Sequence, residues 1–219
     1  FNDNYLMKEK KRKLYGALNN SSDINAIYMY LLSVFSHPKF EILQKDFKYE
    51  NNNFINFLPD AQSKEEQIML SDLNHYLPND ILVKLDRAAM ANSLETRTPF
   101  LDYKVAEVAW SLPIESKIPN NFRNTGKWIL NKILEKQIPK KLINKKKKGF
   151  AIPLGHWLRG PLKDWAGDLL SKDAIESQGY FDYRNVQDLW NSHQNKEDDH
   201  YAKLWVILMW QSWIDANKK

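Results

Sequence analysis

The hydrophobic positions of this chain recur mainly at the three- to four-residue spacing that places them on one face of a helix. Runs in which apolar and polar residues alternate, as they do in strands, are few and short. The sequence therefore predicts a mainly α fold. The pattern predicts longer helices over residues 5–16, 24–35, 63–77, 79–93, 101–112, 125–137, 161–170, 183–193 and 198–217.

Polar and proline residues mark several expected helix ends. Ser63 and Glu66 have the spacing of a capping box, in which a side chain satisfies free N–H groups of the first turn. Pro78 fits the first turn of a helix, so it is expected to separate the helix before it from the helix after it. Asp102 stands near the start of another helix.

Two segments depart from the common pattern. Residues 37–59 are Asn-rich and predict a loop or an insertion. The last helix, over residues 198–217, carries apolar side chains on nearly all sides, which predicts that it is buried and that its tryptophans belong to the core.

Composition excludes several classes of protein. Hydrophobic residues make up 43% of the chain, enough for a packed core, and seven glycines are few for Gly-rich phosphate loops. The absence of cysteine excludes disulfides, thiolate metal sites and cysteine nucleophiles, and it agrees with a cytoplasmic location. No apolar stretch is long enough to cross a membrane, and the five histidines lack zinc-site spacing, so no metal site is predicted.

The predicted helix over residues 79–93 carries Lys84 and Arg87 on one face, opposite an apolar stripe. Two cations on one face are able to bind an anion such as a phosphate. The alternative is an ordinary solvated face on which Lys84 pairs with Asp80, four residues earlier.

Charges also occur inside the apolar run that follows. Glu95 and Arg97 lie two residues apart, and Pro99 favours an extended backbone before it. In an extended segment the two side chains point to the same side. They are expected to form a buried pair, with either a structural or a catalytic role.

A third candidate is the lysine run at 145–148, which leads directly into Gly149 and Phe150. One lysine folded inward is able to stabilise negative charge during phosphoryl or nucleotidyl transfer. The alternative is an ordinary solvated basic run, which holds much of the excess positive charge behind the net charge of +5.

Taken together, these segments resemble the synthetase domain of glutamine-hydrolysing asparagine synthetases. The resemblance is strong over about 63–170, and it depends on five motifs in the family's order and spacing. They are 76–90 (YLPNDILVKLDRAAM), 93–102 (SLETRTPFLD), 126–127 (GK), 147–153 (KKGFAIP) and 157–161 (WLRGP).

The resemblance implies a function. Enzymes of this family release ammonia from glutamine in a glutaminase domain. They use ATP and Mg²⁺ to adenylate aspartate, and the ammonia then displaces AMP. The implied fold is the helical C-terminal part of an α/β domain of the adenine-nucleotide α-hydrolase-like type.

The resemblance also implies roles for single residues. Lys147 matches the lysine beside the reacting phosphates, although Lys146 and Lys148 differ from what many relatives carry there. Arg87, with Lys84 on the same face, matches a basic position near the phosphates. Glu95 matches an acidic position near the acceptor, and Lys127 matches a basic position on the next helix.

Two family motifs are absent from the sequence: the Ser-Gly-Gly-x-Asp-Ser pyrophosphate loop and a Gly- and acid-rich motif. Both lie upstream in the family, so we expect one helical region over residues 1–219 that completes its site with the N-terminal half of the synthetase domain and a glutaminase domain. Three alternatives are a relative that amidates a sugar, peptide or β-amino acid, a non-catalytic helical module, and a nucleic-acid binder. No RNA-binding motif supports the last.

We therefore predict that residues 1–219 alone do not catalyse aspartate-dependent exchange between ATP and pyrophosphate, because the phosphate-binding loop is absent. We also expect an apolar docking face that promotes self-association. Exchange by the purified chain, free of any contaminating synthetase, would contradict the first expectation, and a monomer in sedimentation would contradict the second.

Overall fold

The secondary structure is mainly helical, as predicted. In a computed structural model of the chain, the described residues are 11, 13–19, 24–35, 41–48, 61, 63–119, 127–143 and 152–217. Within these ranges, β-pairing is confined to a single bridge between Leu43 and Phe181. The chain divides into unit 1 (Phe1–Asn53 and Phe150–Lys219) and unit 2 (Phe54–Gly149). This division concerns packing, and the prediction of one region over residues 1–219 stays a prediction.

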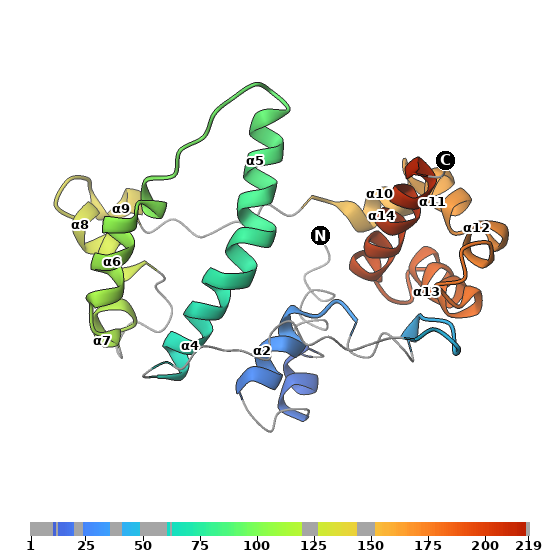
Figure 1. The fold of residues 1–219 in the computed structure, drawn as a ribbon, viewed down its shortest axis with the longest axis horizontal. Helices are drawn as coiled ribbons and strands as arrows, with labels where there is room; N and C mark the ends of the chain where they lie inside the picture. The colour runs from blue at the N-terminus through green and yellow to red at the C-terminus, as the bar shows by residue number, and fades with distance from the viewer. Residues whose placement is uncertain are drawn as a thin grey trace. The chain divides into compact units, whose positions relative to one another are not determined.

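Unit 2 begins with one continuous helix made of three stretches (Figure 1). Ser63 caps it as predicted, because its side chain accepts the N–H of Glu66 at 3.2 Å. The three stretches are α4 (Lys64–Ser71), the π-helical η1 (Asp72–Leu82) and α5 (Val83–Met90).

The predicted break at Pro78 is wrong, because Pro78 lies inside η1. In an α-helix, the proline ring clashes with the carbonyl four residues earlier. A π-helix pairs groups five residues apart, and its wider turn moves that carbonyl away from the ring. The helix therefore continues through the proline.

The rest of unit 2 consists of η2 (Pro99–Leu101), α6 (Tyr103–Ser111), α7 (Ile114–Lys117), α8 (Trp128–Leu134) and α9 (Lys140–Ile143). Asp102 caps α6 as expected, accepting the N–H of Lys104 at 2.9 Å. Lys117 connects three helices of this unit. Its Nζ donates to the carbonyl of Trp110 at 3.1 Å and lies 4.0 Å from Glu66, and both charged side chains are largely buried.

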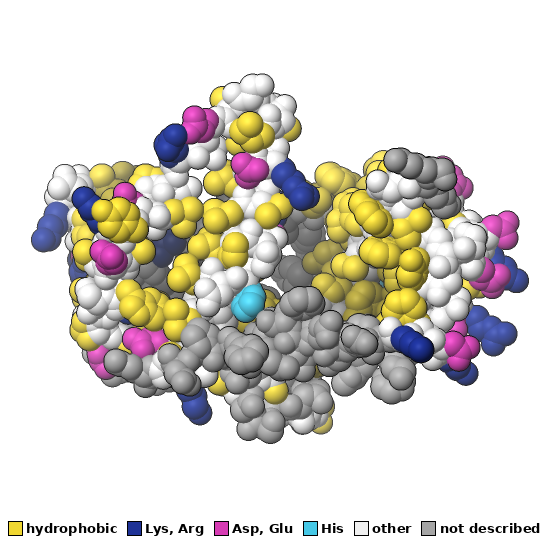
Figure 2. Space-filling view, in the orientation of Figure 1, with side chains coloured by type: hydrophobic (Ala, Val, Ile, Leu, Met, Phe, Trp, Pro, Cys, Tyr) yellow, Lys and Arg dark blue, Asp and Glu magenta, His cyan; other side chains and the backbone are white. Residues whose placement is uncertain are grey.

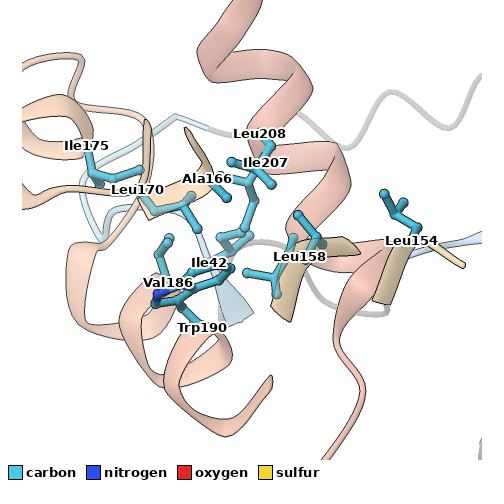
Figure 3. Packing of buried hydrophobic residues seen from close by; sticks show 11 residues of the cluster. Ile42, Leu154, Leu158, Ala166, Leu170, Ile175, Val186, Trp190, Ile207 and Leu208 are labelled. Carbon is cyan, nitrogen blue, oxygen red and sulfur yellow. The ribbon is translucent and has the colours of Figure 1, made fainter. Parts of the chain in front are cut away.

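Unit 1 has its core among its C-terminal helices. Its helices are α2 (Ile24–Leu32), α10 (Leu154–Arg159), α11 (Lys163–Leu169), α12 (Lys172–Glu176), α13 (Tyr183–Gln194) and α14 (Tyr201–Asn217). Figure 3 shows apolar side chains from α10, α11, α13 and α14 pointing toward one another. The buried cluster comprises Ile42, Leu154, Leu158, Ala166, Leu170, Ile175, Val186, Trp190, Leu204, Ile207 and Leu208.

Ile42 reaches this core from the segment that the sequence predicted as a loop or insertion. Residues 41–48 are largely irregular, as expected, but Ile42 is only 2% exposed. Its carbonyl accepts the N–H of Asp182 at 2.8 Å, and the N–H of Gln44 donates to the carbonyl of Tyr180 at 3.0 Å. The hydrophobic pattern missed this contribution because the apolar residues of this segment, Ile42 and the adjacent Leu43 among them, show no sustained helical or strand spacing.

The last helix is buried on one side only, so the prediction of burial on nearly all sides is wrong. Leu204, Ile207 and Leu208 are fully buried, whereas Trp210 is 39% and Trp213 58% exposed. Figure 2 shows hydrophobic side chains gathered on the outer face of α14. In unit 1, the neighbours α10, α11 and α13 pack against the other face.

Two adjacent residues of α14 test this one-sided burial. Leu208→Ala removes a fully buried side chain and is expected to lower the free energy of unfolding by about 2–5 kcal/mol. Met209→Ala, at a site that is 39% exposed, is the matched control and should cost less than about 1 kcal/mol. Chemical denaturation measures both, and equal losses would contradict the orientation of α14.

Candidate functional site

Lys84 and Arg87 lie on an exposed face of α5. The Nζ of Lys84 is 3.0 Å from Oδ1 of Asp80, so Lys84 makes the i, i+4 pair that the sequence offered as the alternative to an anion site. The side chain of Arg87 makes no hydrogen bond or ion pair within the described part of the chain. Of these two cations, Arg87 is the one that is free to bind an anion.

The C-terminal end of α5 turns the chain sharply at Ser93. This residue has φ 56°, in the left-handed region. The N–H of Leu94 donates to the carbonyl of Ala89, and the N–H of Ser93 donates to the carbonyl of Met90, each at 3.0 Å. These two bonds form a Schellman motif, which satisfies carbonyls at the helix end and fixes the direction in which the chain leaves.

The segment that leaves this turn is extended and carries the predicted Glu95–Arg97 pair. Thr98, before Pro99, has φ −97° and ψ 110°, as the residue before a proline should. Glu95 and Arg97 are paired at 2.5 Å on the same side of the segment. The predicted burial is wrong, because the two side chains are 73% and 86% exposed, and the residues between α5 and α6 are all exposed. Figure 1 shows this segment as the connection that leaves the end of α5 and leads to α6.

Lys127 begins the next helix of the unit. It has φ 62°, directly before α8, and it lines an apolar pocket of about 720 Å³ in unit 2. Trp110 of α6 and Trp128 of α8 also line this pocket. Lys84, Arg87 and Glu95, the other predicted site residues of unit 2 that the structure describes, are not part of its wall. The described part of the structure therefore does not gather Lys84, Arg87, Glu95 and Lys127 around one pocket.

Arg159, from the motif at 157–161, has a dense set of partners in unit 1. Its Nε donates to the carbonyl of His193 at 2.6 Å, and its Nη atoms donate to the carbonyls of Gly155 and Asp198 at 3.3 Å. A guanidinium whose donors are used by three carbonyls serves the fold, because it joins the end of α10 to the end of α13 and the start of α14.

Asp199 completes this cluster. Its Oδ1 lies 3.4 Å from Nη2 of Arg159 and 3.1 Å from Nδ1 of His193, which is fully buried. Gly155 allows this approach, because a Cβ there would lie 2.8 Å from the same oxygen. The pKa of Asp199 lies below its ordinary value of 3.8. Burial, the largest single influence, acts to raise it, but a hydrogen bond with His193, the charges of Arg159 and His193 and the backbone of Tyr201 together outweigh burial.

Some predictions fall outside what the structure describes. Lys147, the predicted catalytic lysine, and the whole run at 145–148 lie outside the described residues. Among the described helices, none is both long and apolar enough to cross a membrane. The described His, Asp and Glu side chains form no group of three that is arranged to hold a metal ion.

Comparison with known proteins decides the family. The sequence model of one family, described as asparagine synthase, matches residues 5–215. The chain belongs to the asparagine synthase family. No solved structure matches it.

Curated relatives of this family member are named as asparagine synthetases and, at lower identity, as amidases. Asparagine synthetase (glutamine-hydrolyzing) 1 of Bacillus subtilis is 35% identical over 67% of this chain and 22% of its own length. A putative asparagine synthetase (glutamine-hydrolyzing) of Mycobacterium tuberculosis is 38% identical over 65% of this chain and 21% of its own length. Amidase chry2 of Gibberella zeae is 28% identical over 56% of this chain and 19% of its own length. The chain thus spans about a fifth of the length of these relatives.

The motifs of this asparagine synthase family member serve different ends. In unit 2, the motif at 93–102 presents exposed charges, whereas in unit 1 the motif at 157–161 supplies the internal cluster around Arg159. Sequence reasoning missed His193 and Asp199. The available signals were the arginine of that motif and the polar run at 198–200, placed directly before an apolar helix.

The shifted pKa of Asp199 predicts a pH-dependent stability. A carboxyl whose pKa is lowered by folding stabilises the fold above its ordinary pKa of 3.8, and this contribution is lost as the pH falls through the folded pKa. Asp199→Asn should therefore lower the free energy of unfolding at pH 7 by about 1–3 kcal/mol, because Arg159 loses a charged partner.

Denaturation of wild type and variant between pH 7 and pH 3 checks this. The difference should be constant near neutral pH and shrink below about pH 4. Asp168→Asn, which changes an exposed carboxyl on α11, is the control and should cost little at any pH. A difference for Asp199→Asn that persists unchanged into acid would mean that shape, and not charge, matters there.

Proposed function

We propose that this chain is the helical C-terminal part of the synthetase domain of an ATP-dependent, AMP-forming amidotransferase. The reaction is the adenylation of a carboxylate, with aspartate as the default acceptor, followed by amidation with ammonia from glutamine. The observation that carries the proposal is the family match over residues 5–215, together with five motifs in order. The names of the first relatives, which include glutamine hydrolysis, support it.

The proposed roles concern Lys147, which lies outside the described residues, and four residues that the structure describes. Lys147 stabilises the negative charge that builds up on the phosphates as pyrophosphate leaves. Arg87, with Lys84 beside it, contributes positive charge near the phosphates. Glu95 and Lys127 face the acceptor, one repelling and one attracting its carboxylates, so that together they orient it.

The described residues fit part of what ATP and Mg²⁺ require. When bound, ATP supplies the adenylyl group and Mg²⁺ neutralises phosphate charge. Arg87 is exposed and unpaired within the described ranges, so it suits a phosphate. The described carboxylates do not form a metal-binding group, so ligands for Mg²⁺ would come from other parts of the complete protein. The α/β adenine-nucleotide α-hydrolase-like fold of the complete domain belongs to the same proposal.

Exposed apolar side chains support the proposed partners, the N-terminal half of the synthetase domain and a glutaminase domain. In unit 2, Met90 is 59%, Phe100 62% and Val108 63% exposed. Figure 2 shows hydrophobic side chains along the helix that contains α5. Exposed apolar side chains of this kind favour contact with further protein. When that protein is absent, they favour self-association.

A second candidate is amidation of an acceptor other than aspartate. Two fungal relatives are named amidases, chry2 of Gibberella zeae and chyE of Penicillium rubens, each 28% identical over 56% of this chain. The apolar pocket beside Lys127 also suits a carboxylate with an apolar body better than it suits aspartate. Exchange between ATP and pyrophosphate, measured with a panel of carboxylic acids, distinguishes the two candidates.

The complete gene product tests the proposal through its lysine run. Lys147→Ala should reduce the turnover of adenylation by ~10²-fold or more, because a fixed ammonium beside the departing pyrophosphate stabilises the transition state. The measurement is acceptor-dependent exchange between ATP and pyrophosphate.

Neighbouring lysines are the matched controls for this variant. Lys145→Ala and Lys146→Ala should stay within a few-fold of wild type, because solvated charges are screened by salt. Lys147→Arg should restore activity only in part, since a planar fork places its charge differently. Equal losses for the alanine variants would reduce the run to a general basic patch, and absence of exchange in the wild type with any acceptor would refute the proposed function.

A further inference from the structure

We propose that Ser93 is a positioning residue. Its left-handed backbone fixes the direction of the extended segment 94–98 and thereby the place at which the Glu95 carboxylate meets the acceptor. The inference rests on the proposed function, because the acceptor role of Glu95 belongs to that proposal.

The backbone of Ser93 is the first observation. Among the described residues, three non-glycine residues have positive φ: Ser93, Lys127 and Lys196. Glycine is the usual residue at this position of a Schellman motif, because a side chain is disfavoured there. The Ser93 side chain is exposed and makes no hydrogen bond with a described residue that would offset this cost. Stability alone therefore gives no reason for a serine at this position.

We attribute the presence of a serine at position 93 to its narrower range of backbone conformations compared with glycine. Glycine populates both signs of φ, so a glycine at residue 93 would leave the exit direction free to vary whenever the helix end frays. A serine held by the two Schellman bonds has a narrower choice of conformations. The segment that follows therefore leaves α5 in one direction.

The far end of the segment is fixed as well. Pro99 holds Thr98 in an extended conformation, and Asp102 anchors the start of α6 through the N–H of Lys104 at 2.9 Å. The segment 94–98 is thus held at one end by the turn at Ser93, and at the other by Pro99 and the side-chain cap of Asp102.

Glu95 depends on these ends because its side chain has little else to hold it. Within the described part of the chain, its side chain pairs with Arg97, and both are largely exposed. Exposed pairs restrain side chains weakly. The position of the carboxylate is therefore set mainly by the backbone, and Ser93 precedes Glu95 by only two residues.

Three variants of the complete gene product test the proposal. Ser93→Gly keeps the turn but frees the backbone. Ser93→Asn keeps a side chain, and asparagine tolerates the left-handed region better than most residues. Lys196→Gly makes the same relief of strain in unit 1, at φ 61°, and serves as the matched control.

Kinetics give the first readout, through exchange between ATP and pyrophosphate. Ser93→Gly should raise the KM for the acceptor by about threefold or more while the KM for ATP stays unchanged, because misplacement of an orienting group is costly. Ser93→Asn and Lys196→Gly should keep both KM values near wild type. A purely structural role predicts instead that Ser93→Gly, which relieves strain, loses nothing. Wild-type KM values in Ser93→Gly, or equal losses in Ser93→Asn, would overturn the proposal.

Native-state trypsin cleavage after Arg97 gives a readout that needs no activity. This bond lies inside the segment, and Arg97 is 86% exposed. Ser93→Gly should be cut there about threefold faster or more than wild type, Ser93→Asn and Lys196→Gly at the wild-type rate, because cleavage follows local opening. If the wild type shows no exchange with any acceptor, the proposed function fails, while equal cleavage rates in all four proteins would refute the positioning role independently.

Discussion

In unit 1, the ends of three helices meet at the guanidinium of Arg159. Arg159 stands next to Leu158, which is fully buried, and its donors reach carbonyls at the ends of two other chain segments. Helix ends leave carbonyls without partners, and burying them without a hydrogen bond is costly. By satisfying these groups together, Arg159 allows the ends of α10, α13 and α14 to approach closely enough for their apolar faces to form one core. The adjacent carboxylate of Asp199 balances the charge that this arrangement buries.

The candidate functional segment of unit 2 is fixed by local turn and cap contacts, whereas Arg159 of unit 1 is fixed by a network of side-chain hydrogen bonds. The segment of unit 2 is exposed and lacks a dense network of partners, so its shape comes from the turn at Ser93, the proline at 99 and the cap at Asp102. Such devices act locally and leave side chains free to contact a ligand. The two units thus represent two ways of fixing the motifs of one family, a buried network for Arg159 and a restrained chain for Glu95.

Local signals in the sequence predicted local structure well. The caps at Ser63 and Asp102 could be predicted because a cap depends on only a few neighbouring residues. The break predicted at Pro78 is wrong because helix type, α or π, is set by context beyond the proline itself. The burial of α14 misled because an apolar surface does not reveal whether anything covers it, and Trp213 remains largely exposed.

In the candidate site, too, the features set by local sequence could be predicted and those set by tertiary packing could not. The pairing of Glu95 with Arg97 follows from their spacing in an extended segment, but their exposure depends on packing that the spacing does not encode. The cluster of Arg159, His193 and Asp199 joins residues distant in sequence, so no local pattern predicted it. Family motifs located Arg159 without revealing that its partners are structural.

The two units are completed at different times while the chain is synthesised. Unit 2 is one uninterrupted stretch, whereas unit 1 combines an early segment with a late one. Glu41 is ion-paired with Lys203, 162 residues later, and Ile42 enters a core whose other members belong to the late segment. During translation, all of unit 2 is synthesised before the helices of unit 1 that pack against Ile42. The early segment therefore cannot complete this core until α14 has been synthesised, and closing a loop of this length adds to the time required.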